Sequence, residues 1–246
     1  MRKLFTVVLG VASVAGCARN IDLDRFTTPQ EMLDAAVAEK ERGNCVGATP
    51  VFRRVLLEFS PRDLQTATAR FHLAECLVED NQYVEASRQF RRVANEFPTG
   101  ELAALALLRS GDALAQLWKR PELDPTYGQS AMAAYTELLN RYPLATEADS
   151  ARQRSNDLSN RFAVKEFRTG RYYYRHGAYD SAIIYFRNVV GDYPRSDVVP
   201  AALLTLVDIY RRLGYEQERE ETCQLLFRFH SDTPGLAESC TDDAVS

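Results

Sequence analysis

The sequence predicts an all-α fold, a superhelical solenoid of about five stacked helix pairs. Apolar residues recur at helical spacing along most of the 246 residues, and no long stretch alternates apolar and polar residues as half-buried strands do. A short pattern recurs in four segments: an alanine, an aromatic residue four positions later, and a second aromatic after seven more. Three of these segments are followed at once by proline, which ends a helix.

Each element of this repeated pattern has a physical role. The small alanine allows a neighbouring helix to approach closely, and the aromatic one turn later fills the gap between helices. The pattern resembles the tetratricopeptide repeat, whose typical unit has about 34 residues. The four copies are Ala48/Phe52/Phe59, Ala86/Phe90/Phe97, Ala131/Tyr135/Tyr142 and Ala182/Phe186/Tyr193, and the prolines are Pro98, Pro143 and Pro194.

The first helix has a clear start signal. Thr28 can cap it, Pro29 suits its first position, and Glu31 completes a capping box. From this start, the repeats divide the chain into five expected units at 29–60, 61–98, 99–143, 144–194 and 195–231, followed by a C-terminal tail at 232–246.

The later units depart from an ideal array. The third is expected to carry an insertion between its helices, from about Trp118 to Thr126. The first helix of the fourth is expected to run from Thr146 to about His176, with its polar opening half projecting beyond the stacked core. The fifth keeps the length but loses the alanine–aromatic signature, as terminal capping units often do.

The N-terminal segment is typical of an export signal. A basic start precedes an apolar run from Leu4 to Val14, which is too short to cross a bilayer. The sequence VAGC ending at Cys17 resembles the lipobox of bacterial lipoproteins. The resemblance implies a signal peptide at 1–16, acylation of Cys17 and a tether at 17–28, and Ala18 implies sorting to the outer membrane. The alternative is an ordinary signal peptide with a chance cysteine.

Composition argues against several functions. The net charge is −4 and no Lys/Arg block occurs, so nucleic-acid binding is not expected. The histidines, His72, His176 and His230, are scattered, and no phosphate-binding loop, nucleophile elbow or paired metal motif is present. We therefore expect a non-enzymatic protein with no metal and no cofactor other than the covalent lipid on Cys17.

Four further cysteines offer two disulfides in an oxidising compartment. Cys45 begins the second helix of unit one, and Cys76 lies late in the first helix of unit two, so these helix ends are neighbours in a solenoid. We expect a Cys45–Cys76 bridge, and a second bridge from Cys223 to Cys240 that pins the tail. Four free thiols are the alternative.

The richest candidate for partner contact is the aromatic stretch RYYYRHGAYDSAIIYFRNVVGDYP at 171–194. Tyr173 aligns with a core position of the repeat, so its neighbours face elsewhere. Tyrosine and arginine dominate binding hot spots. The candidates are Arg171, Tyr174 and Arg175, with Phe71 and Glu75 at equivalent groove-facing positions of the second unit.

From Asp124 to Leu213 the sequence is similar to the BamD family, lipoproteins of the outer-membrane protein assembly machine. Its most specific piece is Tyr173-x-x-x-Gly177-Ala178-Tyr179 behind a long helix. The resemblance implies a scaffold on the periplasmic face of the outer membrane. Its C-terminal units would bind POTRA domains of a BamA-like barrel protein, and its N-terminal units would receive unfolded barrel substrates. Other lipoproteins of the same complex are implied as partners. Arg187 is a possible substitute for an arginine that the family often has at position 185.

Two other interpretations are open. A different periplasmic repeat adaptor, similar to the CpoB/YbgF-like proteins, would share the repeats and the anchor. A helical-solenoid lytic transglycosylase is less well supported, because little chain follows the fifth unit.

Overall fold

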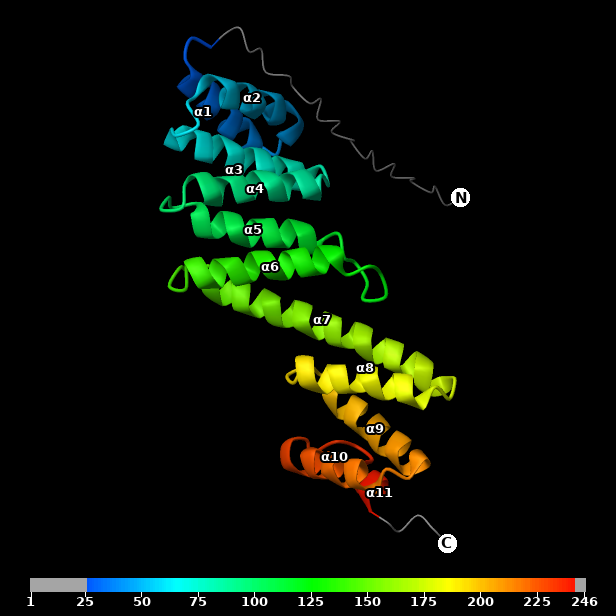
Figure 1. Ribbon diagram of the computed structural model, residues 1–246. Coiled ribbons are helices and arrows are strands. Elements are labelled where there is room, and N and C mark those ends of the chain that lie inside the picture. Colours follow the sequence, from blue (N-terminus) through cyan, green and yellow to red (C-terminus); the bar gives the residue numbers. More distant parts are fainter. Residues whose placement is uncertain (1–25, 242–246) are drawn as a thin grey trace, which may run out of the picture.

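The fold is known from a computed structural model, which describes residues 26–241. Over this range the chain is all helical, which confirms the predicted fold class, and consecutive helices stack as antiparallel neighbours (Figure 1). The helices are α1 Pro29–Glu41, α2 Cys45–Glu58, α3 Leu64–Glu79, α4 Tyr83–Glu96, α5 Ala103–Ala115, α6 Thr126–Arg141, α7 Ala148–Arg175, α8 Tyr179–Asp192, α9 Val199–Leu213, α10 Glu216–Phe229 and α11 Leu236–Cys240.

The repeated alanine and aromatic pack as the sequence indicates. Ala48, Ala86, Ala131 and Ala182 are fully buried, and so, to within 1%, are the aromatics one turn later. Two of these rings need glycine on the facing helix. A Cβ built on Gly111 would lie 2.4 Å from the Tyr135 ring, and one on Gly170 would lie 2.9 Å from the Phe186 ring.

The first helix begins at the predicted capping box. The Thr28 hydroxyl accepts a hydrogen bond from the Glu31 backbone N–H at 3.2 Å, and the Glu31 carboxylate accepts one from the Thr28 backbone N–H at 3.4 Å. This exchange satisfies two of the donors that a helix start leaves unpaired.

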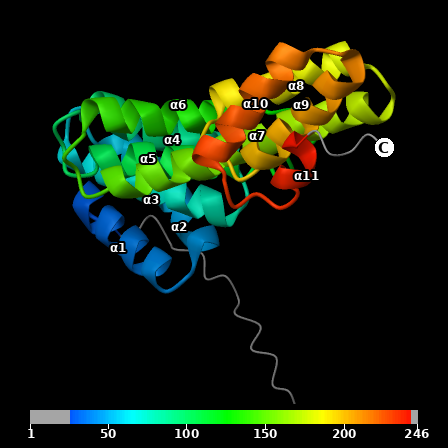
Figure 2. The same ribbon diagram turned by 90° about the horizontal axis from the view of Figure 1, so that it is seen from below.

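The buried side chains form two separate cores. One extends from α1 to the first half of α7, and the other from α8 to α11. The long helix α7 connects the two halves of the molecule, which are displaced from each other (Figure 2). The prediction that the polar opening half of α7 projects into solvent is wrong. Ala148, Ala151 and Leu158 are buried in the N-terminal core, because the polar residues between them occupy only the outer face of the helix.

The insertion of the third unit braces α7 against α6. Trp118 is 1% exposed, its indole N–H donates to the Leu123 carbonyl at 3.4 Å, and its ring stacks on Phe162 of α7 at 4.6 Å. The Arg161 guanidinium lies 4.7 Å from the Trp118 ring centroid and donates to the Trp118 carbonyl. Phe162 in turn stacks on Tyr193 at the end of α8, at 6.5 Å. This aromatic series links both halves of the molecule.

The fifth helix pair is closed by the tail. Cys223 of α10, 3% exposed, occupies the place of the buried aromatic in earlier units, 37 positions after Phe186. Leu236 of α11, 5% exposed, packs into this core, and the Arg211 guanidinium donates to the Ser239 carbonyl. The sequence identified the tail but not this short helix.

Candidate partner-binding surfaces

The first helices of units two, three and four, α3, α5 and α7, line a hollow of about 340 Å³. Asp112 on α5 accepts hydrogen bonds from the Tyr135 hydroxyl at 2.9 Å and from Arg154 on α7 at 2.6 Å. Burial raises the pKa of Asp112 despite these hydrogen bonds. Its other oxygen, Oδ2, is buried and accepts no hydrogen bond from any described residue. The Arg109 guanidinium lies 3.9 Å from this oxygen. A hollow lined by charges of both signs suits a polar segment of a partner.

Glu75 lies at the edge of this hollow, but Phe71 does not face it. The Glu75 carboxylate accepts hydrogen bonds from Lys40 of α1 at 2.5 Å and lies 3.0 Å from His72 Nδ1. Phe71 is 4% exposed and packs edge-on against Phe90 at 5.2 Å. Its predicted role in the groove is therefore wrong, because it occupies the core face of α3.

The C-terminal turn of α7 carries the exposed residues of the aromatic stretch. Arg171 and Arg175 are exposed and make no ion pair with any residue in the described range, and Arg171 lies 5.9 Å from the Phe167 ring. Tyr172, 52% exposed, lies between them on the same face, with its ring 4.3 Å from that of His176. We call Arg171, Tyr172, Arg175 and His176 the α7 surface.

Tyr174 does not belong to this surface, contrary to the prediction. Its hydroxyl donates to the Asp208 carboxylate on α9 at 2.6 Å, and its ring packs on the C-terminal core. The hydrogen bond to Asp208 and partial burial raise the pKa of Tyr174. Tyr174 follows the buried Gly170 by one helical turn, which directs it inward and leaves Tyr172 outside.

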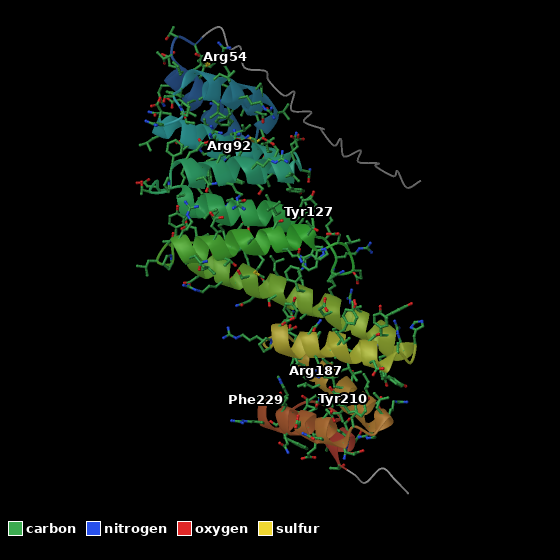
Figure 3. The ribbon with its side chains drawn as sticks, viewed as in Figure 1. Arg54, Arg92, Tyr127, Arg187, Tyr210 and Phe229 are labelled. Atoms are coloured by element: carbon green, nitrogen blue, oxygen red, sulfur yellow. A yellow bond between two sulfur atoms is a disulfide. The ribbon has the colours of Figure 1, made fainter. Side chains whose placement is uncertain are left out.

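Arg187 is exposed on α8, away from the α7 surface (Figure 3). Burial raises the pKa of Tyr210 on α9, and the charge of Arg187 acts in the opposite direction. Tyr185, where the family often has arginine, stacks on Tyr173 at 5.4 Å with an interplanar angle of 9°. The side chain at position 185 therefore packs against α7. Arg187 is a candidate contact separate from the α7 surface.

Both cysteine pairs are joined. Cys45 and Cys76 link α2 to α3 with a Cα–Cα distance of 5.0 Å, and Cys223 and Cys240 link α10 to α11 at 5.7 Å. The first disulfide fastens unit one to unit two, and the second fastens the tail. Cys17 lies outside the described residues.

Two negative findings concern residues 26–241. No group of three or more His, Cys, Asp or Glu side chains among them could hold a metal ion. None of their helices is both long enough and apolar enough to span a membrane.

Two features of these surfaces were missed in the sequence. Tyr172 was not among the predicted contacts, although Arg168, Arg171, Tyr172 and Arg175 follow helical spacing along one face of α7. The proline-bounded insertion was recognised only as an irregularity, and its single tryptophan was the available sign of a packed loop.

The family model and the relatives that match this chain indicate the same family. The family model described as YfiO, outer membrane lipoprotein, matches residues 26–225. A relative from Caulobacter vibrioides, named outer membrane protein assembly factor BamD, is 29% identical over 236 residues, covering 92% of this chain and 75% of the relative. The protein of the same name from Neisseria meningitidis serogroup A is 25% identical over 262 residues, covering 99% and 97% of the two chains.

Solved structures share the repeat class at lower similarity. A thermophilic tetratricopeptide-repeat protein of Thermus thermophilus is 16% identical with a TM-score of 0.39, covering 86% of this chain and 96% of that one. A TM-score this low assigns neither a site nor a partner. The YfiO model, by contrast, covers all ten long helices except the last residues of α10. The chain therefore belongs to the YfiO family of outer membrane lipoproteins, the family of BamD type.

Proposed function

We propose that this protein is a non-enzymatic scaffold lipoprotein of the machinery that assembles β-barrel proteins into the outer membrane. The observation that carries the proposal is the family match over residues 26–225, together with relatives named BamD that align over most of both chains. Acylation of Cys17 would hold the solenoid on the periplasmic face of the outer membrane, because two or more acyl chains anchor a soluble domain stably.

The two halves of the molecule would serve different partners. The C-terminal half would bind POTRA domains of a BamA-like barrel protein through the α7 surface and Arg187. Support comes from Arg171 and Arg175, which lie on the same face of α7 as the exposed Tyr172, and from Arg187 on α8. All three arginines are exposed, and no acidic residue within 26–241 forms an ion pair with them. The N-terminal half would receive unfolded barrel substrates along the hollow beside Asp112, since an extended chain offers amide donors and carbonyl acceptors to the acidic and basic side chains that line it, among them Glu79 and Arg109.

The assignment is tested by purifying the native lipoprotein from envelopes in mild detergent and identifying its stable partners. A POTRA-containing barrel protein is expected among them. Its absence, with a cell-division or cell-wall protein in its place, would favour a periplasmic adaptor of the CpoB/YbgF type instead.

The contact residues are tested separately. Replacing Arg171, Tyr172 and Arg175 by alanine is expected to weaken binding to isolated POTRA domains by about tenfold or more, since hot-spot residues each contribute over 1 kcal/mol. Arg92→Ala, an exposed arginine on α4 in the N-terminal half, is the matched control and should leave the affinity unchanged (Figure 3). Equal affinities for both variants would contradict the assigned surface.

A further inference from the structure

The outward face of α2 presents apolar side chains to solvent. Val46, Pro50, Arg53 and Leu57 follow one another at intervals of four, three and four residues, so they share one face of the helix. All four are exposed, and the exposed fractions of Val46 and Leu57 are 71% and 77%. We call these four residues the α2 stripe.

The repeat itself does not explain the stripe. Counted from the buried alanine of each unit, the same four positions in later second helices carry at most one large aliphatic side chain. They are Val84, Arg88, Arg91 and Asn95 in α4, Gln129, Ala133, Thr136 and Asn140 in α6, and Asp180, Ile184, Arg187 and Gly191 in α8. Unit one alone has large aliphatics at both ends of the stripe and a proline between them, although packing of the repeat does not require them.

We infer that the α2 stripe rests on the membrane surface, with Val46 and Leu57 at the boundary between lipid headgroups and acyl chains. This inference depends on the proposed anchor at Cys17. Nine positions separate Cys17 from Phe26, so the linking chain can span at most roughly 30 Å. Helices α1 and α2 form the end of the stack to which that chain leads, and Arg54 marks α2 there (Figure 3). Each further helix layer adds about 8–10 Å, so the stripe of α2 is the one within easiest reach.

The charge of the stripe fits a lipid surface. Arg53 makes no ion pair with any described residue, whereas its neighbour Arg54 is neutralised by Glu58 at 2.7 Å. The stripe therefore carries one uncompensated positive charge and no acid, and anionic headgroups attract such a charge. Two aliphatic side chains bind lipid weakly, but the anchor would hold them at a high effective concentration. The contact would then orient the solenoid, with its later units extending away from the anchor end.

The test places a tryptophan in the stripe of the full-length, lipid-anchored protein. Leu57→Trp is reconstituted in phosphatidylethanolamine/phosphatidylglycerol vesicles whose acyl chains carry bromine, which quenches nearby indole fluorescence. Asn140→Trp, the same position on α6, is the matched control. The native Trp118 is 1% exposed and supplies a background measured in the parent protein.

The inference predicts that the tryptophan at position 57 loses most of its emission in brominated vesicles, while that at position 140 does not. Adding Arg53→Glu to Leu57→Trp should restore much of the emission. If the protein floats with the vesicles but bromine quenches the tryptophans at positions 57 and 140 equally, the membrane contact is contradicted and the lipid anchor is not. A protein that does not float would overturn both, and partner purification would still test the assembly function independently.

Discussion

Replacing Trp118 by alanine should loosen the join between the two halves of the molecule. The Trp118 ring is the point at which the third-unit insertion touches α7, through the stack on Phe162 and the contact with Arg161. Gly128 at the start of α6 lies beneath it, and a Cβ there would approach the ring to 2.3 Å. The ring therefore fills a closed space between three segments of the chain.

The magnitude follows from this burial. Truncating a buried tryptophan to alanine costs about 3–5 kcal/mol, which is a large part of the 5–15 kcal/mol that typically stabilises a domain. For a chain of this size it corresponds to a fall in Tm of roughly 6–20 °C. Trp118→Phe keeps a ring on Phe162 and loses the hydrogen bond to Leu123, so it should cost less than half as much.

Two assays separate stability from geometry. Urea unfolding followed by circular dichroism gives the free energy of unfolding of each variant. Spin labels at Arg92→Cys and Gln224→Cys, exposed positions on α4 and α10, report the distance between the halves, and its distribution should broaden in Trp118→Ala. Gly128→Ala displaces the same ring from below and should broaden it in the same way.

The reasoning would be refuted by a loss below about 1 kcal/mol for Trp118→Ala, which is no more than an average substitution costs. An unchanged distance distribution in a destabilised variant would also contradict it. In that case α7 would hold its direction without the insertion.

Three further changes probe other contacts. Tyr174→Phe removes the hydroxyl that donates to Asp208 and should lower the free energy of unfolding by about 1–2 kcal/mol. Its affinity for POTRA domains should be unchanged. A loss of affinity without a loss of stability would show that Tyr174 contacts the partner. Burial acts to raise the pKa of Glu75, but hydrogen bonds from His72 and Lys40 outweigh it and lower the pKa. Its stabilising contribution is therefore complete above the unfolded value of about 4.3 and is lost as pH falls through the lower folded pKa. The stability difference between the parent and Glu75→Gln should thus shrink below about pH 4, and a difference constant down to pH 2 would contradict this. Replacing Cys45 and Cys76 together by serine should lower the free energy of unfolding by about 3–4 kcal/mol, because the disulfide closes a loop with a sequence separation of 31 residues. Urea unfolding measures this loss. An unchanged unfolding midpoint would mean that packing alone holds α2 to α3.

The repeat could be read from the sequence because its signal is local. Alanine and aromatic residues one turn apart define the buried face of one helix, and each helix touches mainly its chain neighbours, so helix order nearly determines the fold. The prediction for the polar opening half of α7 was wrong for a related reason. Ala148, Ala151 and Leu158 form a sparse apolar face within a charged segment, and only the position of α6 shows that such a face is covered.

The candidate site was less predictable because it depends on which way individual side chains point. Tyr172 and Tyr174 are two positions apart on one helix, so they face nearly opposite directions, and an error of one position in the repeat register exchanges their roles. Phe71 was misplaced in the same way, on a helix where core and groove positions adjoin. The pairing of Tyr174 with Asp208 joins residues 34 positions apart and has no signature in the sequence.

Depletion of the protein from growing cells tests the central claim most directly. The content of many unrelated β-barrel proteins in the outer membrane, measured by quantitative mass spectrometry, is predicted to fall together before growth stops. An outer membrane with its barrels intact, in cells that instead show a defect in shape or division, would contradict the role in barrel assembly and indicate a periplasmic adaptor.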